Sequence, residues 1–306
     1  MGWVHRFEFF TTNGALAASI HRPVDDLITV TPAVVVTGSW LTVKEQMPDL
    51  YAARLADLGY TAITFDFAGF GASGGVPRQA EIPLKKVADI AAVVREVSAL
   101  SFVNRDAVGL LAICASAQYA LRTIAEGAPV AAFASVAGWF HDTESVAVYY
   151  GGTDGVADRL RRAEDAVAEY QRTGTVRLVP AYRQDDQRAA MFLPLDYYAD
   201  PTRGAVPEWT NQMAEMSWQY WLTYNGLAAA ADIHQPTLFV HSDDCVLPAN
   251  VRRLASIVKG SEVVWGQGLQ IDFYDRDEQV SFALDAAHRH FRSHLGQGTM
   301  TPGTSQ

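Results

Sequence analysis

The stretch that decides the fold is Val108-Gly109-Leu110-Leu111-Ala112-Ile113-Cys114-Ala115-Ser116-Ala117. Residues 108–113 form a short apolar run that predicts a buried strand, and residues 115–126 predict a helix directly behind it. Ala112 and Ser116 are small, as a tight strand-to-helix turn requires, because the backbone passes close on both sides of its tip. Cys114 is therefore predicted to lie at that tip.

A cysteine in such a turn is a candidate nucleophile. The usual nucleophile elbow reads Gly-x-Ser-x-Gly, whereas Ala112 and Ser116 replace both glycines here. Two other interpretations stay open. In a shifted register Ser116 would be the nucleophile, although Gln118 is bulky for that turn. Alternatively, Cys114 packs as a small buried hydrophobe at the end of a strand.

Strands and helices alternate on both sides of this turn. Strands are predicted at residues 33–37, 61–65, 108–113 and 130–136, with helices that begin at Pro48 and Pro83 between them. The alternation resumes late in the chain with strands at residues 237–240 and 263–265 and a last helix at residues 278–295. This order predicts an α/β fold with a mostly parallel central sheet flanked by helices.

The segment between these two halves has a different character, because it is helical, irregular and rich in aromatic residues. We therefore predict a core of residues 1–140 and 232–295, a helical cap of residues 141–231 and a flexible polar tail of residues 296–306. The aromatic side chains of the cap predict an apolar pocket with a polar rim, suited to a medium-sized apolar or aromatic substrate. The pocket candidates are Tyr150, Trp218 and Trp221.

Two loops at the carboxyl ends of the strands complete the predicted site. In the loop after residues 33–37, Ser39 and Trp40 lie where backbone N–H groups would form an oxyanion hole with the N–H of Ala115. Asp244 follows strand 237–240, where the acid of a catalytic triad falls, with Asp243 as a close second. The alternative for both is an acidic loop at the start of a helix.

With these elements in place, further stretches carry a resemblance to a known family, among them Phe65-Asp66-Phe67-Ala68-Gly69-Phe70-Gly71 and Asp272-Phe273-Tyr274-Asp275. The chain resembles the α/β-hydrolase superfamily, and more narrowly its dienelactone-hydrolase-like branch. The resemblance covers roughly residues 30–140 and 235–295. It implies the α/β-hydrolase fold and cleavage of an ester, lactone or thioester through an acyl-cysteine on Cys114.

The histidine of the triad is missing from this pattern. Gln270 stands at the matching position, and an amide cannot act as a general base. A thiol depends less on a base than a hydroxyl does, and a helix N-terminus is expected to lower the pKa of Cys114. His141 and His241 follow strands on the same sheet edge and are candidate substitutes, unless both are structural.

The other polar candidates in the sequence are Glu45, His288 and His290. Glu45 follows the oxyanion loop, where its carboxylate would hydrogen-bond the thiol or orient a substrate, unless it is a surface glutamate at a helix start. His288 and His290 lie on the last helix and are predicted to face solvent.

The composition of the 306 residues excludes several function classes. The net charge is −10, and lysines and arginines do not cluster, so a nucleic-acid partner is not expected. No run approaches the roughly 18 apolar residues of a membrane span. The presence of only two cysteines predicts a cytoplasmic protein. No paired Cys/His spacing is present, so a metal site is not expected, and no dinucleotide fingerprint is present, so a cofactor is not expected. A small molecule is the expected partner, and self-association into a homodimer stays open.

Three hypotheses about function follow. The first is a cysteine-dependent hydrolase that cleaves an ester, lactone or thioester. The second, favoured by Gln270, is a non-hydrolytic lyase, isomerase or cyclase of secondary metabolism on the same scaffold. The third is a binding protein without catalytic activity.

Overall fold

The computed structural model describes residues 3–296; residues 1–2 and 297–306, and with them most of the predicted tail, lie outside the described part. Its centre is an eight-stranded sheet in the order β1-β2-β4-β3-β5-β6-β9-β10. The strands are β1 (Trp3–Thr11), β2 (Gly14–Arg22), β3 (Thr31–Thr37), β4 (Thr61–Phe65), β5 (Val103–Ile113), β6 (Ala132–Val136), β9 (Thr237–Ser242) and β10 (Glu262–Gly266). All neighbours from β4 to β10 pair in parallel, so the predicted α/β fold with a mostly parallel sheet is confirmed.

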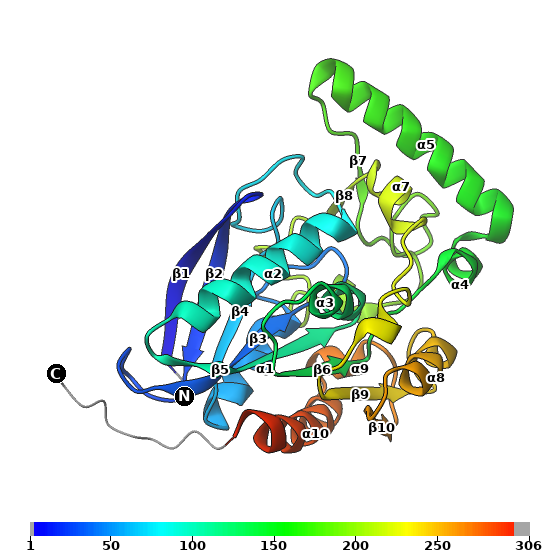
Figure 1. The fold of residues 1–306 in the computed structure, drawn as a ribbon. Helices are drawn as coiled ribbons and strands as arrows, with labels where there is room; N and C mark the ends of the chain where they lie inside the picture. Colours follow the sequence, from blue (N-terminus) through cyan, green and yellow to red (C-terminus); the bar gives the residue numbers. More distant parts are fainter. Residues whose placement is uncertain (1–2, 297–306) are drawn as a thin grey trace.

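Helices cover both faces of this sheet (Figure 1). On one face lie α2 (Pro83–Ala99) and α3 (Ser116–Ala125), which contact each other and β5. On the other face lie α1 (Met47–Asp57) and α10 (Asp277–Leu295). Because both faces are covered, the central strands are apolar throughout, and every residue of β3 is buried. Helix α8 (Pro248–Ile257) packs against β9.

The N-terminal hairpin of β1 and β2 was not predicted. Its two strands pair antiparallel with each other, and β2 also pairs antiparallel with β4. Strand β1 is an edge strand on which Trp3, Phe7 and Phe10 are exposed, so its apolar residues do not follow the alternation that marks a half-buried strand.

Residues 137–236, between β6 and β9, form a segment that we call the insertion. It contains α4 (Thr143–Ala147), η1 (Val148–Tyr150), α5 (Gly152–Thr173), α6 (Asp196–Ala199), α7 (Ser217–Trp221) and η2 (Ala230–Asp232). Besides the helices expected there, it contains a two-stranded antiparallel sheet of β7 (Leu178–Pro180) and β8 (Gln212–Ala214), which was not predicted. Strands of three residues are too short to show a periodicity in the sequence. The predicted cap boundaries stay a prediction.

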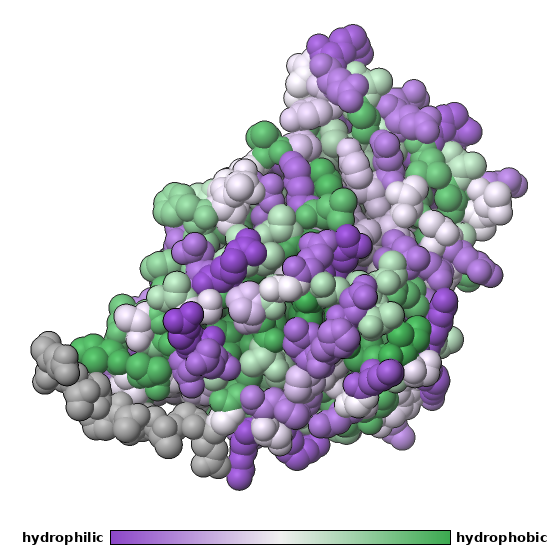
Figure 2. Space-filling view, viewed as in Figure 1, coloured by the Kyte–Doolittle hydropathy of each residue, from purple (hydrophilic) through white to green (hydrophobic). Residues whose placement is uncertain are grey.

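Helix α5 forms the outer arm of the insertion. It extends away from the sheet, and polar side chains predominate over it (Figures 1 and 2). Only three of its residues are buried, Arg159, Ala163 and Ala166. Across the described residues, no helix combines the length and the apolar character that crossing a bilayer would need.

Candidate functional site

Cys114 lies at the tip of the turn between β5 and α3. Its φ of 58° is in the left-handed region, which a residue other than glycine adopts only when the surroundings hold it there. Two backbone hydrogen bonds do so. The Cys114 N–H donates to the carbonyl of Val136 at 3.1 Å, and the N–H of Trp139 donates to the Cys114 carbonyl at 2.9 Å.

Ser116, the alternative nucleophile, has a different role in this turn. It is the first residue of α3 and is buried. Its hydroxyl donates to the carbonyl of Ile113 at 3.1 Å and accepts a hydrogen bond from the hydroxyl of Thr37 at 2.8 Å. Ser116 thus ties the turn to β3, and the geometry favours Cys114 over the shifted register.

The sulfur of Cys114 faces two backbone donors. The N–H groups of Ala115 and Trp40 both point at it, one from the start of the helix and one from the loop after β3. Two N–H groups that converge on one point are the arrangement that stabilises an oxyanion. The structure therefore brings Ala115, Ser39 and Trp40 together at the sulfur, and their role as an oxyanion hole stays a prediction.

Trp218 and Trp221 were predicted to line a pocket, but they support this loop instead. The ring of Trp221 stacks on the ring of Trp40 with centroids 4.4 Å apart, and Trp218 meets Trp40 edge-on at 5.8 Å. Both side chains are fully buried. They hold the loop that carries the Trp40 N–H. The prediction failed because an aromatic-rich sequence does not show which of its side chains are buried in the core and which line a pocket.

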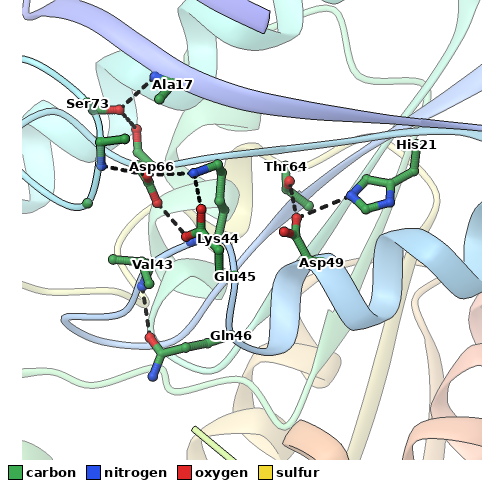
Figure 3. Close-up of polar contacts among 12 residues, drawn as sticks. Ala17, His21, Val43, Lys44, Glu45, Gln46, Asp49, Thr64, Asp66 and Ser73 are labelled. Atoms are coloured by element: carbon green, nitrogen blue, oxygen red, sulfur yellow. Dashed lines mark hydrogen bonds and ion pairs between the residues drawn. The ribbon is translucent and has the colours of Figure 1, made fainter. Parts of the chain in front are cut away.

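A polar network holds the other side of the same loop (Figure 3). Asp66, after β4, accepts hydrogen bonds from the Lys44 N–H at 2.8 Å and the Lys44 ammonium at 3.0 Å. Glu45 pairs with the same ammonium and does not line the cavity at Cys114. The expectation that Glu45 bonds the thiol or a substrate was therefore wrong. Its carboxylate is engaged by the neighbouring lysine, and burial raises its pKa.

Three hydroxyl groups gather beside the sulfur. The Ser39 hydroxyl lies 3.0 Å from that of Tyr198 and 3.1 Å from that of Tyr274, and the hydroxyls of Ser39 and Tyr274 also hydrogen-bond the thiol. Burial raises the pKa of both tyrosines, so at neutral pH they are uncharged hydrogen-bond donors. Neither tyrosine was predicted at the site. The available signal was that Tyr274 lies one helical turn after Gln270, in α9 (Asp272–Asp275).

Gln270 is fixed by three hydrogen bonds. Its amide nitrogen donates to the Ala137 carbonyl at 2.7 Å and to the Tyr274 hydroxyl at 3.2 Å, and its amide oxygen accepts from the Val246 N–H at 3.1 Å. An amide in this position orients the tyrosine that contacts the thiol, and it takes up no proton.

The predicted acids lie away from this group. Asp243 and Asp244 are exposed, and the Asp243 carboxylate pairs with Arg252 at 2.6 Å. Every hydrogen bond of the Gln270 amide goes elsewhere, so Asp244 does not form a triad with it. The expectation for Asp244 was wrong because the loop after β9 turns its side chain to solvent.

The two candidate substitute histidines are structural. His141 accepts a hydrogen bond from the Trp139 indole at 2.7 Å and donates one to the Trp221 carbonyl at 2.8 Å, so both ring nitrogens are occupied. His241 donates to the Val246 carbonyl at 3.1 Å. Among residues 3–296, no imidazole lines the cavity that contains Cys114. The sequence placed both histidines on the correct sheet edge but could not give their direction.

Burial of these histidines makes stability depend on pH. Desolvation lowers the pKa of His141 and His241 to about 4, below the value of about 6.5 in an unfolded chain. Between these values the unfolded chain binds protons that the native chain does not. Stability is therefore complete above pH 6.5 and is lost as the pH falls toward 4. We expect the free energy of unfolding to fall by about 3–4 kcal/mol between pH 7 and pH 5 because of these two histidines.

Urea unfolding at the two pH values measures this loss. In His141→Asn, the difference between pH 7 and pH 5 is expected to shrink by about half, whatever the absolute stability of the variant. An undiminished difference would show that His141 is not the group that titrates.

The thiol itself is less acidic than the sequence suggested. Burial raises the pKa of Cys114, and this outweighs the hydrogen bonds from Ser39, Tyr274 and the two backbone N–H groups, which favour the thiolate. The expected lowering by the helix N-terminus is therefore wrong in its net direction. Cys114 is a protonated thiol at neutral pH.

The cavity in front of this thiol is small and apolar. Its volume is about 100 Å³, below the 300–1,000 Å³ typical of pockets for drug-sized ligands. The insertion contributes most of its walls, while Ser39, Gln270 and Tyr274 supply polar atoms near the sulfur. The remaining lining residues are Trp40, Trp139, Tyr149, Tyr150, Ala190, Met191, Phe192, Leu193, Leu195, Tyr198, Val246 and Ile271. Tyr150 thus lies where it was predicted. Within the described residues, the lining includes neither a carboxylate nor an imidazole, so it offers a metal ion few ligands.

Comparisons with known proteins agree with this architecture. The family model described as "Alpha/beta hydrolase family" matches residues 33–292. The uncharacterized protein PA2218 of Pseudomonas aeruginosa is 28% identical over 293 residues, which cover 92% of this chain and 77% of that protein. Its crystal structure superposes with a TM-score of 0.84 and 24% identity, over 96% of this chain and 94% of the other.

Two further proteins are similar along most of their length. The uncharacterized protein YcjY of Escherichia coli is 28% identical over 284 residues, covering 86% of this chain and 89% of YcjY. The crystal structure of the alpha/beta hydrolase GrgF from Penicillium sp. sh18 has a TM-score of 0.79 and 19% identity, over 96% of this chain and 99% of GrgF. At this identity the structural likeness concerns the fold.

Proposed function

Because the chain belongs to the alpha/beta hydrolase family, we propose that it acts on a carbonyl group and transfers a short apolar acyl group from an activated ester, lactone or thioester to the thiol of Cys114, then to water. The observation that carries the proposal is the position of the sulfur at a left-handed turn, between the N–H groups of Ala115 and Trp40. We also propose that the chain lies near the dienelactone-hydrolase-like branch, whose resemblance implies a cysteine at this position.

The first chemical step needs no charged residue in the cavity. A C–S bond forms between the sulfur and the carbonyl carbon, and the carbonyl oxygen takes the electron pair of the π bond and accepts hydrogen bonds from the two N–H groups. When the carbonyl re-forms, the bond to the leaving group breaks. The thiol proton passes to that group through the hydroxyls of Ser39 and Tyr274, each of which accepts one proton and gives up another.

The protonation state of the site selects the leaving group. A general acid or base with a pKa near 7 would help an ordinary alcohol to leave, and the described residues place no such group at the sulfur. A thiolate or an enolate is a much weaker base than an alkoxide, so it leaves with less assistance from a general acid. The small cavity then favours a short acyl chain, in contrast to the medium-sized substrate expected from the sequence.

The second step, attack by water on the acyl-cysteine, has no base among the described residues to assist it and is therefore slow. Rapid mixing with an S-phenyl thioester of butyrate tests this. We expect thiophenol release in a burst of one equivalent per chain, followed by a slower steady phase. Linear release without a burst would count against a stable acyl-cysteine.

Tyr274 is expected to position and polarise the thiol. Removal of its hydroxyl in Tyr274→Phe takes away a hydrogen bond that favours the charged sulfur, worth about 1.5–3 kcal/mol. The burst rate should fall about 10–100-fold, and the pH of half-maximal alkylation by iodoacetamide should rise. Tyr149→Phe is the matched control, because Tyr149 lines the same cavity but its hydroxyl faces the Leu247 backbone. Equal effects of both changes would assign Tyr274 a packing role only.

A second candidate function is favoured by the fixed amide of Gln270, which stands where a hydrolase would hold its base. This candidate is a non-hydrolytic lyase, isomerase or cyclase, in which the two N–H groups stabilise an enolate oxygen. The two functions differ in their use of water. In H₂¹⁸O, hydrolysis leaves one ¹⁸O atom in each acid released, whereas the second candidate gives unlabelled product.

A further inference from the structure

A cluster of three metal-ligating side chains lies far from Cys114. His290 and His294 are one helical turn apart on α10, and Glu262 is the first residue of β10. The nearest ligand atoms of the three side chains all lie within 4.8 Å of one another. Glu262 is at the amino end of a parallel strand, whereas Cys114 follows the carboxyl end of β5, so the cluster and the cavity lie at opposite ends of the parallel strands.

His290 is the buried member of this cluster, only 2% exposed. Its Nε2 lies 3.3 Å from the carbonyl oxygen of Pro236, which can only accept a hydrogen bond, so Nε2 carries the proton. The prediction that His290 faces solvent was therefore wrong. This contact is also the one that metal-binding histidines commonly make with their second nitrogen.

The other nitrogen of His290, Nδ1, faces Glu262. Nδ1 is buried, has no hydrogen-bond partner among the described residues and lies 3.6 Å from a carboxylate oxygen of Glu262. With the proton on Nε2, a lone pair of Nδ1 faces a negatively charged oxygen. A cation between the two atoms satisfies both.

We propose that Nδ1 of His290, the imidazole of His294 and the carboxylate of Glu262 bind a divalent transition-metal ion of the Zn²⁺ class. Two imidazoles and one carboxylate suit zinc, whereas calcium and magnesium take oxygen ligands. Bond lengths of 2.0–2.2 Å in a tetrahedral site bring ligand atoms to about 3.3 Å from one another. Glu262 and His294 are exposed and can close this gap by rotation, while His290 stays fixed.

The proposed ion would connect β10 to α10. Strand β10 is five residues long and forms the edge of the sheet, and α10 is the last described helix. A ligand from the strand and two from the helix hold them together, and solvent completes the coordination. The site therefore acts on stability and has no part in the chemistry at Cys114. The pair of histidines four residues apart was visible in the sequence, but Glu262 was not linked to it, and no metal was expected.

Calorimetric titration of the EDTA-treated full chain with ZnCl₂ tests the proposal, together with Tm in the presence and absence of zinc. We expect one equivalent to bind, and Tm to rise by about 5 °C when free zinc is 100 times Kd. His294→Ala and Glu262→Gln should each weaken binding at least about tenfold, because each removes a direct ligand. His288→Ala is the control on the same helix, since His288 faces the Tyr60 hydroxyl, and it should bind zinc as the unmodified chain does.

Cobalt identifies the ligands, because Co²⁺ bound by nitrogen and oxygen gives d–d absorption without the charge-transfer band of a thiolate. A thiolate band would place the metal on a cysteine and overturn the proposal. Undiminished binding in both His294→Ala and Glu262→Gln, or no binding at millimolar zinc, would overturn it as well.

Discussion

Replacement of Cys114 by alanine is expected to abolish the burst of leaving-group release and to lower the acylation rate at least about 10³-fold. The oxyanion donors remain in this variant, because both are backbone N–H groups of Ala115 and Trp40. What is lost is the atom that attacks the carbonyl carbon. The loss therefore falls on the rate of acyl transfer and leaves the binding of the acyl group in the cavity largely unchanged.

Ser116→Ala is the matched control for this prediction. Its hydroxyl is 3.1 Å from the Ile113 carbonyl and 2.8 Å from the Thr37 hydroxyl, so its removal affects the turn but no reacting atom. We expect a modest loss of stability, about 1 kcal/mol, and a burst that is retained. Full activity in Cys114→Ala together with inactivity in Ser116→Ala would reassign the nucleophile.

A large effect on stability is expected at a buried ion pair beside α2. The Glu81 carboxylate accepts hydrogen bonds from the Lys86 ammonium and the Tyr119 hydroxyl, each at 2.7 Å. Glu81 and Lys86 are both buried. Glu81→Ala leaves the ammonium without its partner, and burial already lowers the pKa of Lys86. We expect a loss of about 3–5 kcal/mol in the free energy of unfolding, measured by urea denaturation.

Two comparisons separate the buried charge from other causes. Asp277→Ala removes a carboxylate from the exposed pair with Arg54, and it should cost less than about 1 kcal/mol. The double change Glu81→Leu with Lys86→Met should recover much of the loss, because neither charge of this ion pair then remains buried without its partner. Equal losses for the single and double changes would show that packing, and not the charge, carries the effect.

The regular elements near Cys114 were predictable from the sequence because local signals agree there. The run of apolar residues in β3, Pro48 and Pro83 at the helix starts, and the small residues around Cys114 each act over a few positions. The hairpin of β1 and β2 and the short strands of the insertion were missed. Their stability comes from pairing with distant residues, and their own sequences carry little periodicity.

The environment of the thiol was only partly predictable. Chain order placed Ser39, Trp40 and Ala115 near Cys114, since the carboxyl ends of parallel strands meet at one edge. Side-chain direction is set by tertiary packing, so the sequence did not reveal that His141 hydrogen-bonds the Trp221 carbonyl or that Tyr274 reaches the sulfur.

The balance of effects on the thiol also lay beyond the sequence. Proximity to a helix start favours the thiolate, whereas burial favours the thiol, and only the packed structure shows that burial prevails. This balance leads to the preference for an activated acyl donor and to the slow second step.

Intact-mass spectrometry after the burst tests the central claim most directly. The chain is mixed with the S-phenyl thioester of butyrate, quenched in acid at the end of the burst, weighed and digested. The account predicts a mass increase of one butyryl group, located on the peptide that contains Cys114 and absent from Cys114→Ala. Complete turnover of the thioester with no butyryl group on Cys114 at any time would contradict it.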